Sequence, residues 1–136
     1  MAEKTIDIAS PILSRNERLA DQLRQRFKET STYVINVLSS PGSGKTTTIL
    51  GTNERLRDKA GLRCAVIEGD IASDVDAITM KEAGMPAIQI NTGGLCHLEG
   101  NMIMEAVDAF DQAVGLENID VIFIENVGNL VCPVDF

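Results

Sequence analysis

The sequence predicts a three-layer α/β domain with a mainly parallel sheet. Four short apolar runs alternate with segments of helical periodicity, which is the order expected of β-α-β units. The first apolar run leads through a glycine-rich turn into a helix-compatible segment, a junction that can gather backbone N–H groups around one point. Notable polar residues follow all four apolar runs, and the carboxyl ends of parallel strands lie at one edge of a sheet.

The stretch from residue 33 to residue 48 organises the chain. Residues 33–38 are apolar except for Asn36, which suits a buried parallel strand, and a helix-compatible run follows residue 46. Between them the chain reads S-S-P-G-S-G-K-T, with Ser39 where the usual phosphate loop has glycine. Strand, glycine-rich turn and helix in this order predict a phosphate loop, and therefore the fold of a P-loop NTPase.

The residue types of this loop indicate how it would hold a nucleotide. Its glycines let the backbone turn its N–H groups toward one anion, and the helix N-terminus adds a partial positive charge. Lys45 is expected to reach the β- and γ-phosphates, and the hydroxyl of Thr46 is expected to bind Mg²⁺. The expected nucleotide-binding residues are Gly42, Ser43, Gly44, Lys45, Thr46 and Thr47.

Length, composition and charge narrow the class of protein. The chain has 136 residues, which suggests one domain, and 44% of them are hydrophobic, enough to form a core. A formal net charge of -8 argues against nucleic acid as the main partner, since phosphate contacts require clustered lysine and arginine. No apolar run approaches the ~20 residues of a membrane span, and the N-terminus lacks a secretory signal. Three cysteines without a disulfide-rich composition favour a reducing cytoplasm, with thiols that are free or bound to metal.

The N-terminal region is expected to divide into an arm and a helix. Residues 1–13 are the expected arm, and residues 14–136 are the expected nucleotide-binding domain. Ser14 and Glu17 have the spacing of a capping box, which predicts that the first helix begins at Ser14. The apolar stripe of this helix consists of Leu19, Leu23 and Phe27. The opposite face, expected to lie in solvent, carries Arg18, Arg24, Arg26 and Lys28.

The remaining elements follow from the apolar pattern and from the turn residues that interrupt it. Helices are expected at residues 44–60, 73–83 and 99–114, and strands at residues 62–68, 87–91 and 120–125. Glycines at positions 61, 84 and 115 stand where C-terminal helix caps belong. Cys64, in the middle of the second strand, is expected to be a small buried hydrophobe rather than a ligand.

Carboxylates at the strand ends are candidates for the chemistry of nucleoside triphosphate hydrolysis, which requires charge neutralisation, a metal ion and a positioned water. Glu125 ends the last apolar run, a position suited to holding Mg²⁺, and begins E-N-V-G. This segment has the spacing of the D-x-x-G element, in which the glycine amide, here that of Gly128, contacts the γ-phosphate. Asp70 is a second candidate for binding Mg²⁺ or placing the water, and Asp74 is a third. The expected catalytic residues are Lys45, Asp70, Glu125 and Gly128.

A second group of residues has the chemistry of a transition-metal site. Cys96 and the only histidine, His97, are good ligands for nickel or zinc, and Cys132 is available as a third. Three ligands are fewer than the four of a closed zinc site, so either the site stays open or two chains pool ligands across a two-fold axis. The alternative is two unrelated thiols and a loop histidine. Because Cys132 lies four residues after Gly128, a loop that moves when the γ-phosphate leaves would move this thiolate as well.

These motifs together resemble a known family, the nickel-incorporation GTPases that mature nickel–iron hydrogenases. The resemblance lies in VLSSPGSGKTT, VIEGDIASDVDA, INTGGLCHLEGNMI and FIENVGNLVCP. It implies a SIMIBI-class P-loop GTPase that binds GTP and Mg²⁺, forms a homodimer through its metal site, and works with the hydrogenase large subunit and another nickel-maturation protein. It also implies that Cys96, His97 and Cys132 bind nickel or zinc at the dimer interface. The residues implied to serve the nucleotide and Mg²⁺ are Lys45, Thr46, Asp70 and Glu125.

The chain also departs from this family in its C-terminal part. The N-K-x-D element that reads guanine does not occur, so the preference for GTP follows from the resemblance alone. The last strands of the domain are expected to be missing, which would leave an exposed sheet edge and make the activity of this chain uncertain. Three alternatives remain: a urease-type nickel accessory GTPase, which usually has Cys-Pro-His at the position of Cys96-His97; a small-molecule kinase, although no arginine follows Arg63; and a nucleotide-independent metal-binding or dimerisation module.

Overall fold

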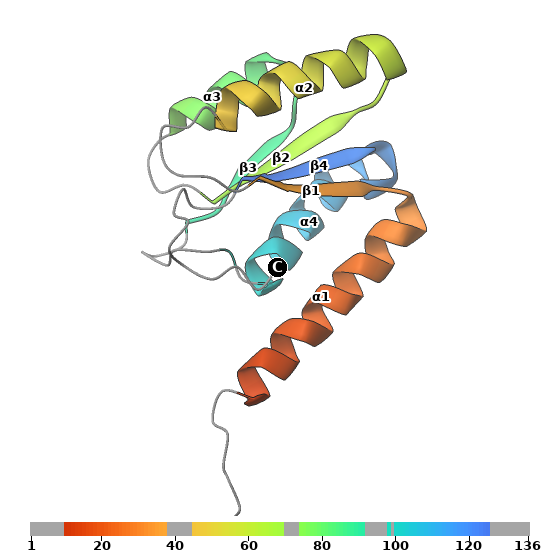
Figure 1. Ribbon diagram of the computed structural model, residues 1–136, viewed down its shortest axis with the longest axis vertical. Helices are drawn as coiled ribbons and strands as arrows, with labels where there is room; N and C mark the ends of the chain where they lie inside the picture. The colour runs from red at the N-terminus through yellow and green to blue at the C-terminus, as the bar shows by residue number, and fades with distance from the viewer. Residues whose placement is uncertain (1–9, 38–44, 70–73, 92–97, 99, 126–136) are drawn as a thin grey trace, which may run out of the picture.

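The computed structural model describes residues 10–37, 45–69, 74–91, 98 and 100–125, and its elements alternate between helix and strand (Figure 1). In chain order they are α1 (Ser10–Thr30), β1 (Tyr33–Val37), α2 (Lys45–Ala60), β2 (Cys64–Glu68), α3 (Asp74–Glu82), β3 (Ala87–Gln89), α4 (Gly100–Val114), the short 3-10 helix η1 (Leu116–Asn118) and β4 (Val121–Glu125). The predicted helices and strands are all present, with boundaries that shift by one or two residues except at α1.

The four strands form one parallel sheet in the order β1-β4-β2-β3. Helices α2 and α3 cover one face, and α1 and α4 cover the other, so the predicted three-layer architecture is confirmed (Figure 1). Since every pair of neighbours is parallel, the carboxyl ends of all four strands lie at the same edge of the sheet. This edge is where the sequence places its candidate functional residues.

The central strands β2 and β4 are buried along their whole length, and their side chains alternate between two cores. Ala65 and Ile67 pack with α1 and α4, whereas Cys64 and Val66 pack with α2 and α3. The alternation places the next residue, Glu68, on the face covered by α2 and α3. Both aliphatic cores therefore end at the carboxyl edge of the sheet.

The first helix differs from the prediction at its start and on its polar face. It begins at Ser10 rather than Ser14, inside the segment expected to be an arm. Pro11 suits the first turn of a helix, where its missing N–H has no intrahelical partner, and the capping-box pattern falls inside the helix. Arg26 does not face solvent but forms ion pairs with Asp108 and Asp111 of α4, and its side chain is 27% exposed.

The apolar stripe of α1 is confirmed, because Leu23 and Phe27 belong to the core beneath the sheet. Gly61 and Gly84 end their helices with φ of 66° and 77°, which explains glycine at these two positions. Strand β1 is parallel as predicted, but the prediction that it is buried is wrong: it lies at the edge of the described sheet, and its Tyr33 is 77% exposed, because an edge strand has a neighbour on one side only. Among the described residues, no helix is long and apolar enough to cross a membrane.

Candidate functional site

The helix that follows the candidate phosphate loop begins at Lys45, directly after the glycine-rich turn. Its second residue, Thr46, is half-buried, and Thr47 is exposed. The strand that enters the loop, β1, ends at Val37 at the same edge of the sheet. The predicted strand before residue 38 and the predicted helix after residue 44 are therefore confirmed, whereas the loop between them, with Gly42, Ser43 and Gly44, lies outside the described residues.

Glu125 is the last residue of β4, as predicted, and its side chain is only 3% exposed. It is the register partner of Val37, the last residue of the strand that enters the phosphate loop. A buried carboxylate thus lies one strand away from the start of that loop. The structure thus confirms that Glu125 is a carboxylate at the end of a buried strand, and its role toward Mg²⁺ stays a prediction.

A second buried carboxylate, which the sequence reasoning missed, lies beside Glu125. Glu68 ends β2, is 2% exposed, and is the register partner of Glu125 on the neighbouring strand. Oε1 of Glu68 and Oε2 of Glu125 are buried and accept no hydrogen bond, although each residue makes another interaction. The sequence signal for Glu68 was a charged residue at the end of a continuous apolar run, because a charged residue is unusual in a completely buried strand.

Two carboxylates in register at a strand end provide oxygen ligands of the kind that Mg²⁺ prefers. The carboxylate oxygens of Glu68 and Glu125 therefore fit a hard cation better than they fit nickel or zinc. Within the described ranges, no cluster of three or more histidine, cysteine, aspartate or glutamate residues could hold a metal ion. Any site with three such ligands must include residues outside these ranges.

The backbone at the end of β2 is held on both sides. The N–H of Gly69 donates to the carbonyl of Glu125 at 2.8 Å, and the carbonyl of Glu68 accepts from the N–H of Ile90 at 2.7 Å. The side chain of Leu98 packs directly against Gly69 and is 1% exposed. The strand ends that carry the two carboxylates are therefore fixed relative to one another and to Leu98.

Several predicted site residues cannot be placed. Asp70, Cys96, His97, Gly128 and Cys132 lie outside the described residues, so their roles stay predictions. Asp74 is the first residue of α3, and the structure describes nothing of its side chain. Cys64 is buried, as predicted for a small hydrophobe, and the pKa of its thiol is raised by burial and, to a smaller extent, by the negative charge of Asp120.

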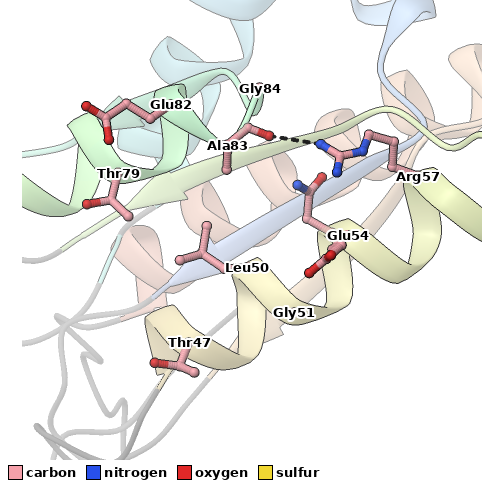
Figure 2. Close-up of a pocket in the computed structure, with 10 residues that line it drawn as sticks. Thr47, Leu50, Gly51, Glu54, Arg57, Thr79, Glu82, Ala83 and Gly84 are labelled. Atoms are coloured by element: carbon pink, nitrogen blue, oxygen red, sulfur yellow. Dashed lines mark hydrogen bonds between the residues drawn. The ribbon is translucent and has the colours of Figure 1, made fainter.

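A groove of about 730 Å³ lies between α2 and α3 (Figure 2). Gly51 and Leu50 lie on its α2 side, and Ala83 lies near the end of α3. Arg57 reaches across and donates to the carbonyl of Ala83 at 3.3 Å, so this guanidinium caps the last turn of α3. Glu68 and Glu125 do not line the groove, which is therefore separate from the carboxylate pair.

At the opposite edge of the sheet, where the strands begin, Asp120 and Arg63 form a charged contact that is not part of the candidate site. The carboxylate of Asp120 accepts a hydrogen bond from the backbone N–H of Arg63 at 2.8 Å and another from its Nε at 3.2 Å. The backbone hydrogen bond is the main reason that the pKa of Asp120 lies below its usual value, and the guanidinium adds to it. This contact joins the segments that lead into β2 and β4.

Comparison with known proteins identifies relatives of the whole described region. Residues 33–136 match the nucleotide-binding domain of the CobW/HypB/UreG family. The chain is 43% identical over 134 residues to the hydrogenase/urease maturation factor HypB of Helicobacter hepaticus, covering 98% of this chain and 54% of that protein. It is 44% identical over 133 residues to the hydrogenase maturation factor HypB of Escherichia coli K12, covering 98% of this chain and 44% of that protein. The chain thus spans about half the length of the curated relatives it matches.

Solved structures agree with this result. The crystal structure of HypB from Helicobacter pylori in complex with nickel superposes with a TM-score of 0.77 at 42% identity, covering 88% of this chain and 54% of that one. The structure of HypB from Archaeoglobus fulgidus gives a TM-score of 0.75 at 35% identity, with 88% and 55% covered. The fold, the strand-end carboxylate and the matched region lead to one conclusion: this chain belongs to the CobW/HypB/UreG family of nucleotide-binding domains.

Proposed function

We propose that this chain is the nucleotide-binding part of a GTPase that delivers nickel during the maturation of nickel–iron hydrogenase. The observation that carries the proposal is the position of Glu125, buried at the end of β4 and in register with the strand that enters the phosphate loop. The names of the relatives, hydrogenase maturation factor HypB, support the process, and the nickel complex of the Helicobacter pylori protein supports the cargo.

In this proposal the phosphate loop and the carboxylate edge bind GTP together. The backbone N–H groups of residues 42–47 and the ammonium group of Lys45 neutralise the phosphates, while the N-terminus of α2 adds its partial positive charge. Mg²⁺ would be held by the hydroxyl of Thr46 and by carboxylates drawn from Asp70, Glu125 and Glu68. When bound, it neutralises charge that develops on the phosphate oxygens during transfer to water.

The cargo is expected to bind through Cys96, His97 and Cys132. Thiolate and imidazole ligands suit nickel and also zinc, and three ligands leave room for a partner to remove the metal. A homodimer that pools these ligands across a two-fold axis would complete the site. Recipients would be the hydrogenase large subunit and another nickel-maturation protein, and the reducing cytoplasm would keep the thiols available.

Coupling between the two sites follows from one short segment. Glu125 begins it, Gly128 is expected to contact the γ-phosphate, and Cys132 is expected to bind nickel. Loss of the γ-phosphate would release Gly128 and shift the Cys132 thiolate, because only a few residues separate them. Nickel would then be held with different affinity before and after hydrolysis.

The test is a Lys45→Ala variant, with Lys59→Ala on the exposed last turn of the same helix as its control. Lys45→Ala is expected to lower GTP hydrolysis by about 100-fold or more, because the variant loses a positive charge expected to contact the phosphates. Nickel binding by the nucleotide-free variant is expected to be retained. Nickel titrations with GDP and with a non-hydrolysable GTP analogue measure the coupling. Unchanged hydrolysis in Lys45→Ala, or equal nickel affinity in both nucleotide states, would overturn the proposal.

A further inference from the structure

Glycine stands in the middle of α2, at position 51, where the helix itself does not require it. Glycine is less favourable than alanine inside a helix, because its backbone loses more conformational freedom on folding. Two common structural reasons for glycine do not apply, because Gly51 does not adopt a positive φ and an added Cβ would meet nothing within 4 Å. Gly51 lies on the wall of the groove between α2 and α3, so the open space beside it belongs to that groove (Figure 2).

A buried amide faces the same groove. Asn53 is only 5% exposed and lines the groove two residues after Gly51. Its side chain makes no hydrogen bond to another described residue. Burying an amide without hydrogen bonds is unfavourable, since the group gives up its bonds to water and gains none in return. An occupant of the groove would supply the missing bonds to an N–H donor and a carbonyl acceptor that lie side by side.

The groove has the length of a short extended peptide. It follows α2 from Thr47 at one end to Arg57 at the other (Figure 2). The step from residue 47 to residue 57 corresponds to about 15 Å along an α-helix, which is the length of about five extended residues. Gly51, Ala83 and Gly84 line the groove with little or no side chain, so a peptide main chain has room to approach both helices.

The charges around the groove favour a basic occupant. Glu54 of α2 and Glu82 of α3 are exposed carboxylates in its lining. Arg57 is the one basic residue in that lining, and its guanidinium already donates to the carbonyl of Ala83 and to the carboxylate of Asp58. The carboxylates therefore exceed the available positive charge, which attracts lysine or arginine side chains and repels anions.

We propose that the groove between α2 and α3 binds an extended, basic peptide segment of a partner protein, with the amide of Asn53 paired to its main chain. The segment lies along α2 beside Gly51, and its lysine or arginine side chains pair with Glu54 and Glu82. This single occupant accounts for two destabilising features of α2, the glycine inside the helix and the buried amide without a hydrogen bond. The site is separate from the carboxylate pair at the strand ends, and it does not depend on the proposed nickel and nucleotide chemistry.

The test measures peptide binding by the full chain. The probe is a fluorescently labelled, capped pentapeptide of alternating valine and lysine, compared with the same peptide carrying glutamate in place of lysine. Fluorescence anisotropy gives the dissociation constants, and the amide NMR spectrum of the protein reports on the side-chain amide of Asn53. We expect the basic peptide to bind about 10-fold more tightly than the acidic peptide and to shift the Asn53 side-chain signals.

Two variants and a matched control locate the binding in the groove. Gly51→Ala puts a methyl group into the open space, so it should weaken binding of the basic peptide by about 10-fold while raising the melting temperature. Asn53→Leu removes both hydrogen-bonding groups and should also weaken binding by about 10-fold. Thr48→Ala, at an exposed position of α2 outside the groove lining, improves helix propensity as Gly51→Ala does and should bind the peptide as wild type does.

Each part of the proposal has a result that would overturn it. Equal affinity for the two peptides, or no binding of the basic peptide at about 1 mM, would refute a basic occupant. A basic peptide methylated at its main-chain nitrogens that binds as tightly as the original would refute the pairing with Asn53. Unchanged affinity in Gly51→Ala, where the added Cβ meets no neighbour, would place any binding outside the groove, even if Asn53→Leu fails to fold. If sedimentation shows a wild-type dimer that Gly51→Ala abolishes, the occupant is a second copy of this chain, and the proposal is wrong.

Discussion

The effects of Glu68→Gln and Glu125→Gln on the stability of the chain are expected to be non-additive in the absence of divalent cations. Glu68 and Glu125 are register partners on adjacent parallel strands, and both side chains are almost completely buried. Neighbouring strands lie about 4.8 Å apart, and two negative charges at that spacing repel by about 3 kcal/mol at an effective dielectric constant of about 20. Glutamine keeps the size of the side chain and removes one charge, so each single variant loses this interaction, and we expect a double-mutant cycle to give a coupling free energy of about 1–3 kcal/mol.

The assay is urea unfolding at neutral pH with a chelator present, applied to Glu68→Gln, Glu125→Gln and the double variant. Either substitution removes the same interaction, so the effect of the double variant should differ from the sum of the two single effects by about 1–3 kcal/mol. Excess Mg²⁺ should stabilise wild type more than either variant, because a cation compensates two charges there and only one in the variants. Glu82→Gln, at an exposed position on α3, is the matched control and should change stability by less than about 0.5 kcal/mol.

One result would refute this reasoning. If the two effects add within about 0.5 kcal/mol, the carboxylates do not interact, in spite of their register. That result would also remove Glu68 from the set of residues proposed to serve Mg²⁺.

Two further predictions concern the scaffold. Leu23→Ala should lower the free energy of unfolding by about 2–5 kcal/mol, because this side chain is 1% exposed and packs α1 against the core. Arg24→Ala, on the exposed face of the same helix, should lower it by less than about 1 kcal/mol. Urea unfolding measures both effects, and equal effects would contradict the packing role of α1. The pKa of Asp120 is lowered by hydrogen bonds from Arg63, so its contribution to stability is complete above the ordinary aspartate pKa of about 3.9 and is lost as pH falls through the lower folded value. Asp120→Asn should therefore show a shallower loss of stability than wild type between about pH 5 and pH 2, and identical slopes would contradict this assignment.

Local patterns were sufficient to predict the fold. Alternation of apolar runs with helical segments, together with the glycines that end the helices, fixes both the elements and the parallel sense of the sheet. The parallel sense then places Glu125 and the start of α2 at one edge without any knowledge of tertiary contacts. These predictions depend on residues that are neighbours in sequence, and for that reason they could be made.

What the sequence did not predict depends on contacts between distant segments. Arg26 was assigned to a solvent-facing side of α1 on the pattern of that helix alone. Its ion-pair partners, Asp108 and Asp111, lie on α4, far away in the sequence. The start of α1 was misplaced because a capping-box pattern also occurs within helices, where it has no capping function. The contact of Leu98 with Gly69 has no local signal at all, since nothing near either residue specifies the other.

The strand order places the end of β4 between two other strand ends. In chain order, β4 is the last described strand, but in the sheet it lies between β1 and β2. Its final residue, Glu125, is therefore next to Val37, which enters the phosphate loop, and next to Glu68, which precedes Gly69. Had β4 been added at an outer edge, residue 125 would have touched only one of these strands. Within the described sheet, Glu125 therefore adjoins both the strand that leads into the proposed phosphate loop and the strand end that carries the Gly69–Leu98 contact, and we expect a displacement of Glu125 to affect both neighbours.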